Sequence, residues 1–309
     1  MLTKQMIDIF DLLDSATANG QAVVDYLDGI RAGAITYPLV GPQGKTDMVK
    51  VKIPGKRGKS CGGGAPTIGL LGRLGGLGAR PERIGFVSDG DGALIALAVA
   101  AKLLDMQNKG DFLDGDVLVS THVCPDAPTQ PHTPVAFMGS PVDMAQVNRE
   151  EVSPELDAIL SVDTTKGNRI INHRGFAISP TVKEGYILKT SDDLLDIMTI
   201  TTGQLPKVFA LSTQDITPYG NDLYHLNSIL QPATATSAPV VGVAITTEMP
   251  VPGCATGASH ITDMEEAARF MLETAKAFGR GECKFYCARE FEIIERLYGK
   301  MSHLQTLGK

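Results

Sequence analysis

The sequence has few of the features that mark several large classes of protein. Its 28 lysines and arginines are outnumbered by 35 aspartates and glutamates, which gives a net charge of −7 and leaves no dense basic run. A nucleic acid is therefore not an expected partner. The longest apolar run, Ala93 to Ala101, is too short to span a bilayer, so no membrane partner is expected either.

Cysteines are also scarce. The chain holds five of them, an odd number scattered along the sequence, which does not suit a disulfide framework. The N-terminal stretch carries Lys4, Asp8, Asp11 and Asp14 among its apolar residues, and this pattern predicts an amphipathic helix and not a signal peptide. These features predict a protein of the reducing cytoplasm.

One stretch organises the rest of the sequence. Ile84–Val87 is a short apolar run that can form a strand, and Ala93–Leu104 is an apolar block rich in alanine and leucine, which favours a buried helix. The turn between them carries Asp89 and Asp91. A strand that leads into a helix through such a turn is typical of a parallel α/β sheet, in which ligands bind at the carboxyl ends of strands. The two aspartates either cap the helix or belong to a site.

Strands and helices alternate from about residue 84 to 278. This alternation predicts an α/β fold in which a mostly parallel sheet carries helices on both faces. We expect a single domain over 1–309, with two N-terminal helices in 1–33 and a small β excursion at about 37–64. The buried, neighbouring strands are predicted from runs that are apolar throughout: Ile84–Val87, Val117–Thr121, Ile159–Val162 and Val240–Ile245.

Carboxylates and imidazoles gather where these predicted strands end. The candidate metal ligands are Asp89, Asp91, His122, Asp126, Asp163 and His260. Close carboxylates repel one another unless a cation or a proton separates them. Aspartate and histidine facing one crevice suit a divalent metal, with zinc expected first and manganese or cobalt as alternatives. Taken singly, each aspartate could equally be an ordinary turn residue.

The order of these elements resembles that of co-catalytic zinc exopeptidases of the deblocking and glutamyl aminopeptidase type. The resemblance is carried by Asp89–Leu97, the Val117–Thr121 strand and Ser161–Thr164. It implies a zinc-exopeptidase-like (phosphorylase/hydrolase-like) sandwich, a homo-oligomer, Asp89 as the ligand that bridges two ions and Asp163 as a terminal ligand. The whole chain also resembles a bacterial family known as domain of unknown function 1177, which assigns no activity.

Two parts of the exopeptidase pattern differ in this sequence. Residues 66–83 contain no histidine or aspartate, so the upstream His-x-Asp motif of those enzymes has no counterpart. The segment His122–Asp126 stands where they carry a pair of glutamates, and only His260 can match their closing histidine.

These observations lead to three hypotheses. The first is a metal-dependent hydrolase of a small amide or short peptide, of the aminopeptidase or deacylase kind, in which His122 or Asp126 takes the proton of a metal-bound water. The second is a non-catalytic binding or regulatory protein that keeps the exopeptidase fold without its metal ligands. The third is a lyase or isomerase with a single metal.

Overall fold

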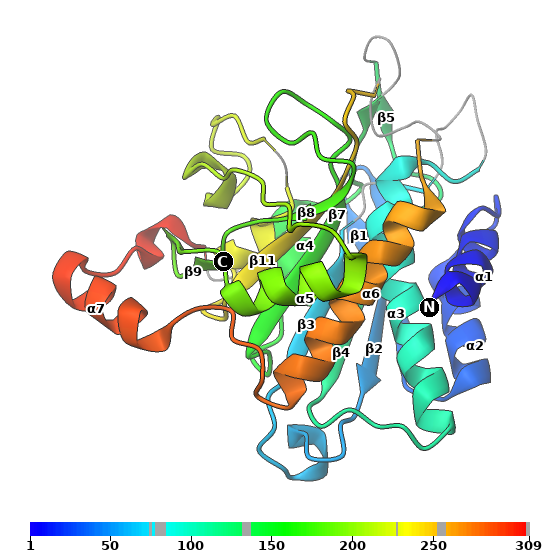
Figure 1. Ribbon diagram of the computed structural model, residues 1–309. Coiled ribbons are helices and arrows are strands. Elements are labelled where there is room, and N and C mark those ends of the chain that lie inside the picture. The colour runs from blue at the N-terminus through cyan, green and yellow to red at the C-terminus, as the bar shows by residue number, and fades with distance from the viewer. Residues whose placement is uncertain (74–75, 78–84, 132–136, 227, 252–257, 307–309) are drawn as a thin grey trace.

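The computed structural model describes residues 1–73, 76–77, 85–131, 137–226, 228–251 and 258–306. One large sheet forms the centre of the molecule, with helices packed across it (Figure 1). Its strands are β1 (Ala34–Gly41), β2 (Gly44–Ile53), β3 (Ile68–Gly72), β4 (Val117–Val123), β7 (Ala158–Thr164), β8 (Gly175–Ile178), β9 (Val182–Lys183), β10 (Tyr186–Ile187) and β11 (Val240–Thr246). A separate small ribbon pairs β5 (Thr129–Gln130) with β6 (Phe137–Met138).

The helices are of two kinds, long α-helices and short 3-10 turns. The α-helices are α1 (Thr3–Leu13), α2 (Gly20–Ile30), α3 (Asp91–Asn108), α4 (Met144–Glu151), α5 (Asp192–Thr202), α6 (Ile261–Gly279) and α7 (Ala288–Tyr298). The 3-10 turns are η1 (Lys59–Cys61), η2 (Ser88–Gly90), η3 (Gln214–Ile216), η4 (Gln231–Thr234) and η5 (Ser302–Leu304). Among the described residues, no helix is long and apolar enough to cross a membrane.

The sheet is mixed, which corrects the prediction of a mostly parallel one. Its strand order is β1-β2-β4-β3-β7-β11-β9-β10, and β8 also pairs with β11. The pairs β4–β3, β3–β7 and β7–β11 are parallel, whereas β1–β2, β2–β4, β8–β11 and the β9 pairs are antiparallel. A parallel centre is therefore flanked by antiparallel edges. The carboxyl ends of its four parallel strands lie at one edge of the sheet.

The predicted strand at Ile84–Val87 is wrong. Ile84 lies outside the described residues, and Gly85, Phe86 and Val87 belong to no strand. The central strand is β3, in a glycine-rich stretch whose composition predicts turns or close backbone packing. Glycine is tolerated there because other parts of the chain approach it closely: a Cβ at Gly72 would lie 2.6 Å from the carbonyl oxygen of Gly92 in α3.

The other three predicted strands are confirmed as β4, β7 and β11, of which β7 and β11 are neighbours. All residues of β11 are buried, as expected for a strand covered on both faces. The segment that the sequence sets apart at about 37–64 supplies β1 and β2, which join the main sheet through the pairing of β2 with β4.

The helices cover the two faces unequally. On one face α2, α3 and α6 contact the strands, and α1 and α5 pack against α3 and α6 (Figure 1). The larger core lies in this layer, and α3 is buried along nearly its whole length. On the opposite face lie α4, η3 and η4, with a smaller core that includes Leu71, Ile159 and Leu230. Helix α7 projects away from the sheet.

Helix α3 begins directly against the ends of β3 and β7. A Cβ at Gly92 would lie 2.4 Å from the carbonyl oxygen of Arg73 and 2.6 Å from that of Val162. Only glycine allows so close an approach of helix to strand ends. This packing places Asp89, two residues before α3, and Asp91, its first residue, at the carboxyl edge of the parallel strands.

We expect Gly92→Ala to lower the free energy of unfolding by about 1–3 kcal/mol, because the added methyl group has no space in this contact. Gly29 in α2 is a matched control, since a Cβ there meets nothing within 4 Å. Gly29→Ala should stabilise the protein by about 0.5–1 kcal/mol. Urea unfolding of both variants measures these changes, and equal effects at the two positions would contradict the close packing of α3.

Candidate functional site

Asp91 forms a buried ion pair at the carboxyl edge of the sheet. Its carboxylate is fully buried, and its Oδ2 lies 2.6 Å from Nζ of Lys166, whose side chain is only 4% exposed. The hydroxyl group of Ser259 donates a hydrogen bond to Oδ1. Burial raises the pKa of Asp91 above its usual range, and the Lys166 ammonium opposes that shift. Asp91 thus ties the start of α3 to the loop after β7 and to the residues before α6.

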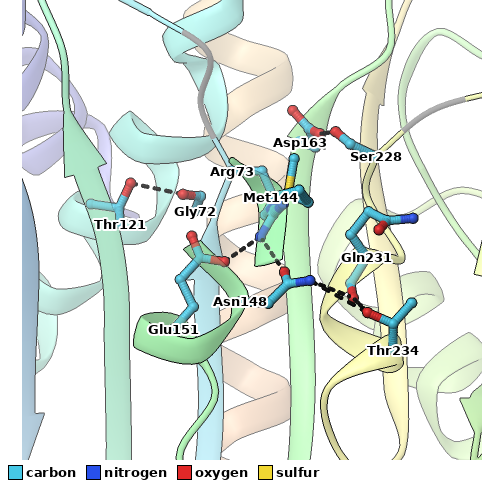
Figure 2. A network of polar contacts seen from close by, with 10 residues as sticks. All are labelled: Gly72, Arg73, Thr121, Met144, Asn148, Glu151, Asp163, Ser228, Gln231 and Thr234. Atoms are coloured by element: carbon cyan, nitrogen blue, oxygen red, sulfur yellow. Dashed lines mark hydrogen bonds and ion pairs between the residues drawn. The ribbon is translucent and has the colours of Figure 1, made fainter. Parts of the chain in front are cut away.

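Arg73 forms a second buried ion pair, on the face of the sheet that carries α4 (Figure 2). This arginine follows β3 directly, is 3% exposed and pairs with Glu151 at the end of α4. Its guanidinium also donates to Oδ1 of Asn148, at 3.3 Å, and Asn148 in turn donates to the carbonyl oxygen of Gln231 at 3.2 Å. The network joins β3, α4 and η4.

Asp163, near the end of β7, lies beside this network without an ion pair to any of the described residues. It is 7% exposed, accepts a hydrogen bond of 3.0 Å from the Ser228 hydroxyl group and a second one from the backbone N–H of Thr164. Burial raises the pKa of Asp163 to about 6, although the nearby Arg73 charge opposes the shift. The Asp91 charge raises the same pKa, so the two aspartates are close enough to interact. Asp163 therefore changes its charge near neutral pH.

Asp89 lies in η2 and is 9% exposed. Its Oδ2 accepts a hydrogen bond of 2.7 Å from the backbone N–H of Gly76, in the loop after β3. Asp89 therefore fixes part of that loop against the start of α3.

The two residues predicted to transfer protons are placed differently from the prediction. His122 lies inside β4, which extends two residues beyond the predicted strand, and its buried Nδ1 is 2.8 Å from the Thr46 hydroxyl oxygen in β2. Asp126 is exposed in the turn that follows β4. His122 is thus part of a buried contact between neighbouring strands, whereas Asp126 faces solvent.

His260 immediately precedes α6 and is exposed. Its Nδ1 lies 3.3 Å from a carboxylate oxygen of Asp263, one turn into the helix. The imidazole lies close enough to Asp91 to influence the pKa of that carboxyl, more weakly than Lys166 does. The structure therefore brings His260 near Asp91 but directs its hydrogen bond toward α6.

The described residues do not fit a metal centre. No group of three or more histidine, cysteine, aspartate or glutamate side chains within them is arranged to hold a metal ion. Of the six predicted ligands, Asp91 is already paired with a buried ammonium group, and His122, Asp126 and His260 have the separate surroundings given above. The prediction that these residues converge on one ion is not met by the part of the chain that the structure describes.

Sequence reasoning missed Arg73, Glu151 and Lys166. Arg73 follows an apolar run, and Lys166 lies three residues after Asp163. A single lysine or arginine after a strand has no sequence pattern that would predict a buried ion pair. Although Gly58–Gly62 matches the spacing Gly-x-Ser-x-Gly, no nucleophile elbow is predicted there. That motif supplies a nucleophile only at a turn from strand to helix, and here Ser60 lies in the short turn η1.

Comparison with known families finds one match over most of the chain. The profile of a family described as "Protein of unknown function (DUF1177)" matches residues 39–308. A search of curated proteins finds no match.

Comparison with solved structures finds enzymes of a similar fold. A glutaminyl cyclase from an Acidobacteriales bacterium has a TM-score of 0.51 and 16% identity, with 91% of this chain and 93% of that chain covered. A leucine aminopeptidase of Caenorhabditis elegans has a TM-score of 0.52 and 11% identity, covering 90% and 66%. The bottromycin maturation enzyme BotP, solved in complex with Mn, has a TM-score of 0.50 and 14% identity, covering 90% and 71%. These likenesses confirm the exopeptidase-like fold.

The pKa of Asp163 predicts a pH dependence of stability. Its value of about 6 in the folded state lies above the 3.8 of an ordinary aspartate, so the folded protein holds this proton more tightly. The contribution of Asp163 to stability is therefore complete below pH 3.8 and is lost as the pH rises through 6. Asp163→Asn cannot ionise, and we expect its stability relative to the wild type to rise by about 2–3 kcal/mol between pH 4 and pH 8.

Urea unfolding at several pH values measures this difference. Asp126→Asn, at an exposed turn position, is the matched control and should show no comparable rise. A constant difference between Asp163→Asn and the wild type from pH 4 to pH 8 would show that Asp163 is not perturbed.

Proposed function

Because this chain belongs to the DUF1177 family, whose description assigns no activity, we propose its function from its fold and its site. The protein binds a small amide or a short peptide at the carboxyl edge of the parallel strands, without a metal held by the described carboxylates. It is then a binding or regulatory protein that keeps an exopeptidase-like fold, the fold of the cyclase and aminopeptidase described above.

The buried pair of Asp91 with Lys166 is the observation that carries this proposal. The resemblance to exopeptidases implies Asp89 as the bridging metal ligand, and Asp91, two residues later at the start of α3, is a further candidate ligand. In this chain the Asp91 carboxylate is fully buried and lies 2.6 Å from an ammonium group. A metal ion that used the same oxygen would have to displace a buried, oppositely charged partner, which is strongly unfavourable.

Asp163 supplies the binding chemistry. Its carboxylate is mostly ionised at pH 7, since its pKa is about 6, and no ion pair to the described residues neutralises it. Ligands of open α/β sheets bind at this edge, beyond the carboxyl ends of the strands. An ionised carboxylate accepts hydrogen bonds from N–H groups, and such charged bonds are stronger than neutral ones. The N–H of an amide or the ammonium group of a peptide suits Asp163.

A metal-dependent hydrolase of a small amide or peptide is the second candidate. It is favoured by the proximity of Asp91 and Asp163, whose mutual repulsion a cation would relieve. The ion would need additional ligands from residues beyond those that the structure describes, since no three histidine, cysteine, aspartate or glutamate side chains among the described residues are grouped to hold a metal ion.

We expect titration with a panel of di- and tripeptides and N-acyl amino acids to reveal saturable binding that releases no cleaved product. Asp163→Asn should weaken this binding tenfold or more, because it removes the charged acceptor. Asp126→Asn should bind as the wild type does. Isothermal titration calorimetry measures the affinity, and mass spectrometry of the same samples detects products.

Three results would contradict the proposal. If the protein purified without added metal contains stoichiometric zinc or manganese and cleaves members of the panel, the hydrolase is correct. If neither binding nor cleavage occurs with any compound, or if Asp163→Asn binds with unchanged affinity, the assignment of the site is wrong.

A further inference from the structure

The carboxyl edge of the sheet concentrates buried negative charge. Asp91 is 0% exposed, Glu151 is 2% exposed and Asp163 is 7% exposed. A buried carboxylate without a partner is costly, and neighbouring carboxylates also repel one another. Positive charge close to these side chains therefore stabilises the folded state in which they are ionised.

Two cations of the chain provide that charge. Lys166 lies in the loop after β7 with its side chain 4% exposed, and its Nζ is 2.6 Å from Asp91. Arg73 follows β3, is 3% exposed and pairs with Glu151. Both cations come from the residues that directly follow parallel strands, and both are removed from water. They are present whenever the chain is folded, whatever the metal content of the solution.

We propose that Lys166 and Arg73 are the permanent counter-ions of this edge and take the place of a divalent cation, so that the site folds independently of metal. The inference extends the proposed function, which rests on the same pair. Its test uses folding alone, so its failure is distinguishable from a failure to bind a peptide.

The geometry of the Asp91–Lys166 pair excludes a metal ion at the same carboxylate oxygen while the pair is formed. Zinc binds a carboxylate oxygen at about 2.0–2.2 Å, which is within the space next to Oδ2 of Asp91 that the ammonium group fills. An ion there would also meet the repulsion of the ammonium charge at close range. The Ser259 hydroxyl group occupies the other carboxylate oxygen. Metal binding at Asp91 thus requires Lys166 to leave its buried position.

Thermal unfolding of the full chain tests this inference. The melting temperature of the wild type should be the same in EDTA, in zinc chloride and in manganese chloride. Lys166→Met keeps a linear apolar side chain but removes the charge, and its melting temperature should fall by about 5 °C or more, because Asp91 stays buried without its partner.

Lys52→Met is the matched control. Lys52 pairs with Glu155 at 3.3 Å, but their side chains are 49% and 53% exposed, and such surface pairs contribute little to stability. Its melting temperature should stay within about 1 °C of the wild type. The double variant Asp91→Asn/Lys166→Met removes both charges, so it should melt above Lys166→Met.

Three results would overturn the inference. The first is a melting temperature of the wild type that rises by several degrees in zinc or manganese or falls by several degrees in EDTA. The second is a melting temperature of Lys166→Met equal to that of the wild type. The third is a double variant that melts no higher than Lys166→Met. If Lys166→Met does not fold, the double variant decides: a folded double variant supports the inference, and an unfolded one contradicts it.

Discussion

Buried carboxylates need positive charge beside them, and this requirement shapes the carboxyl edge of the sheet. Asp91 and Glu151 are removed from water at the ends of parallel strands, where the fold gathers polar groups. In this protein Lys166 and Arg73 balance them. Removing one member of such a pair is far more costly than replacing both, so the two partners depend on each other. Because Arg73 pairs with Glu151 and Lys166 pairs with Asp91, Asp163 has no ion pair with any of the described residues.

The same contacts connect parts of the chain that are distant in sequence. Asp91 joins the start of α3 to the loop after β7 and to Ser259 before α6, while Arg73 joins β3 to α4 and, through Asn148, to η4. The first set lies with the helical layer, and the second lies on the opposite face (Figure 2). Charge pairing therefore holds both layers together at the edge where ligands of this fold class bind. Binding at this edge and the stability of the fold are thus physically linked.

The parts of the fold that depend on continuous apolar runs could be predicted from the sequence. Strands β4, β7 and β11 and helix α3 have this pattern, and they were placed close to their observed bounds. Strand β3 was not predicted because Gly69 and Gly72 indicated turns or close backbone packing. Both glycines do lie in close contact with neighbouring elements, but within a strand. Asp163 was singled out because it follows an apolar run, which is strand β7, whereas Asp91 was singled out after a predicted strand at Ile84–Val87 that the structure does not contain. Lys166 could not be found, since a single lysine has no spacing that reveals an ion pair.

Anomalous diffraction at the zinc absorption edge, from crystals grown with zinc chloride, tests the central claim most directly. The account predicts no anomalous peak between Asp91 and Asp163, together with density for the Lys166 side chain in contact with Asp91. A strong peak between the two aspartates, with Lys166 turned away from Asp91, would contradict it. The measurement distinguishes a counter-ion supplied by the chain from one taken up from solution.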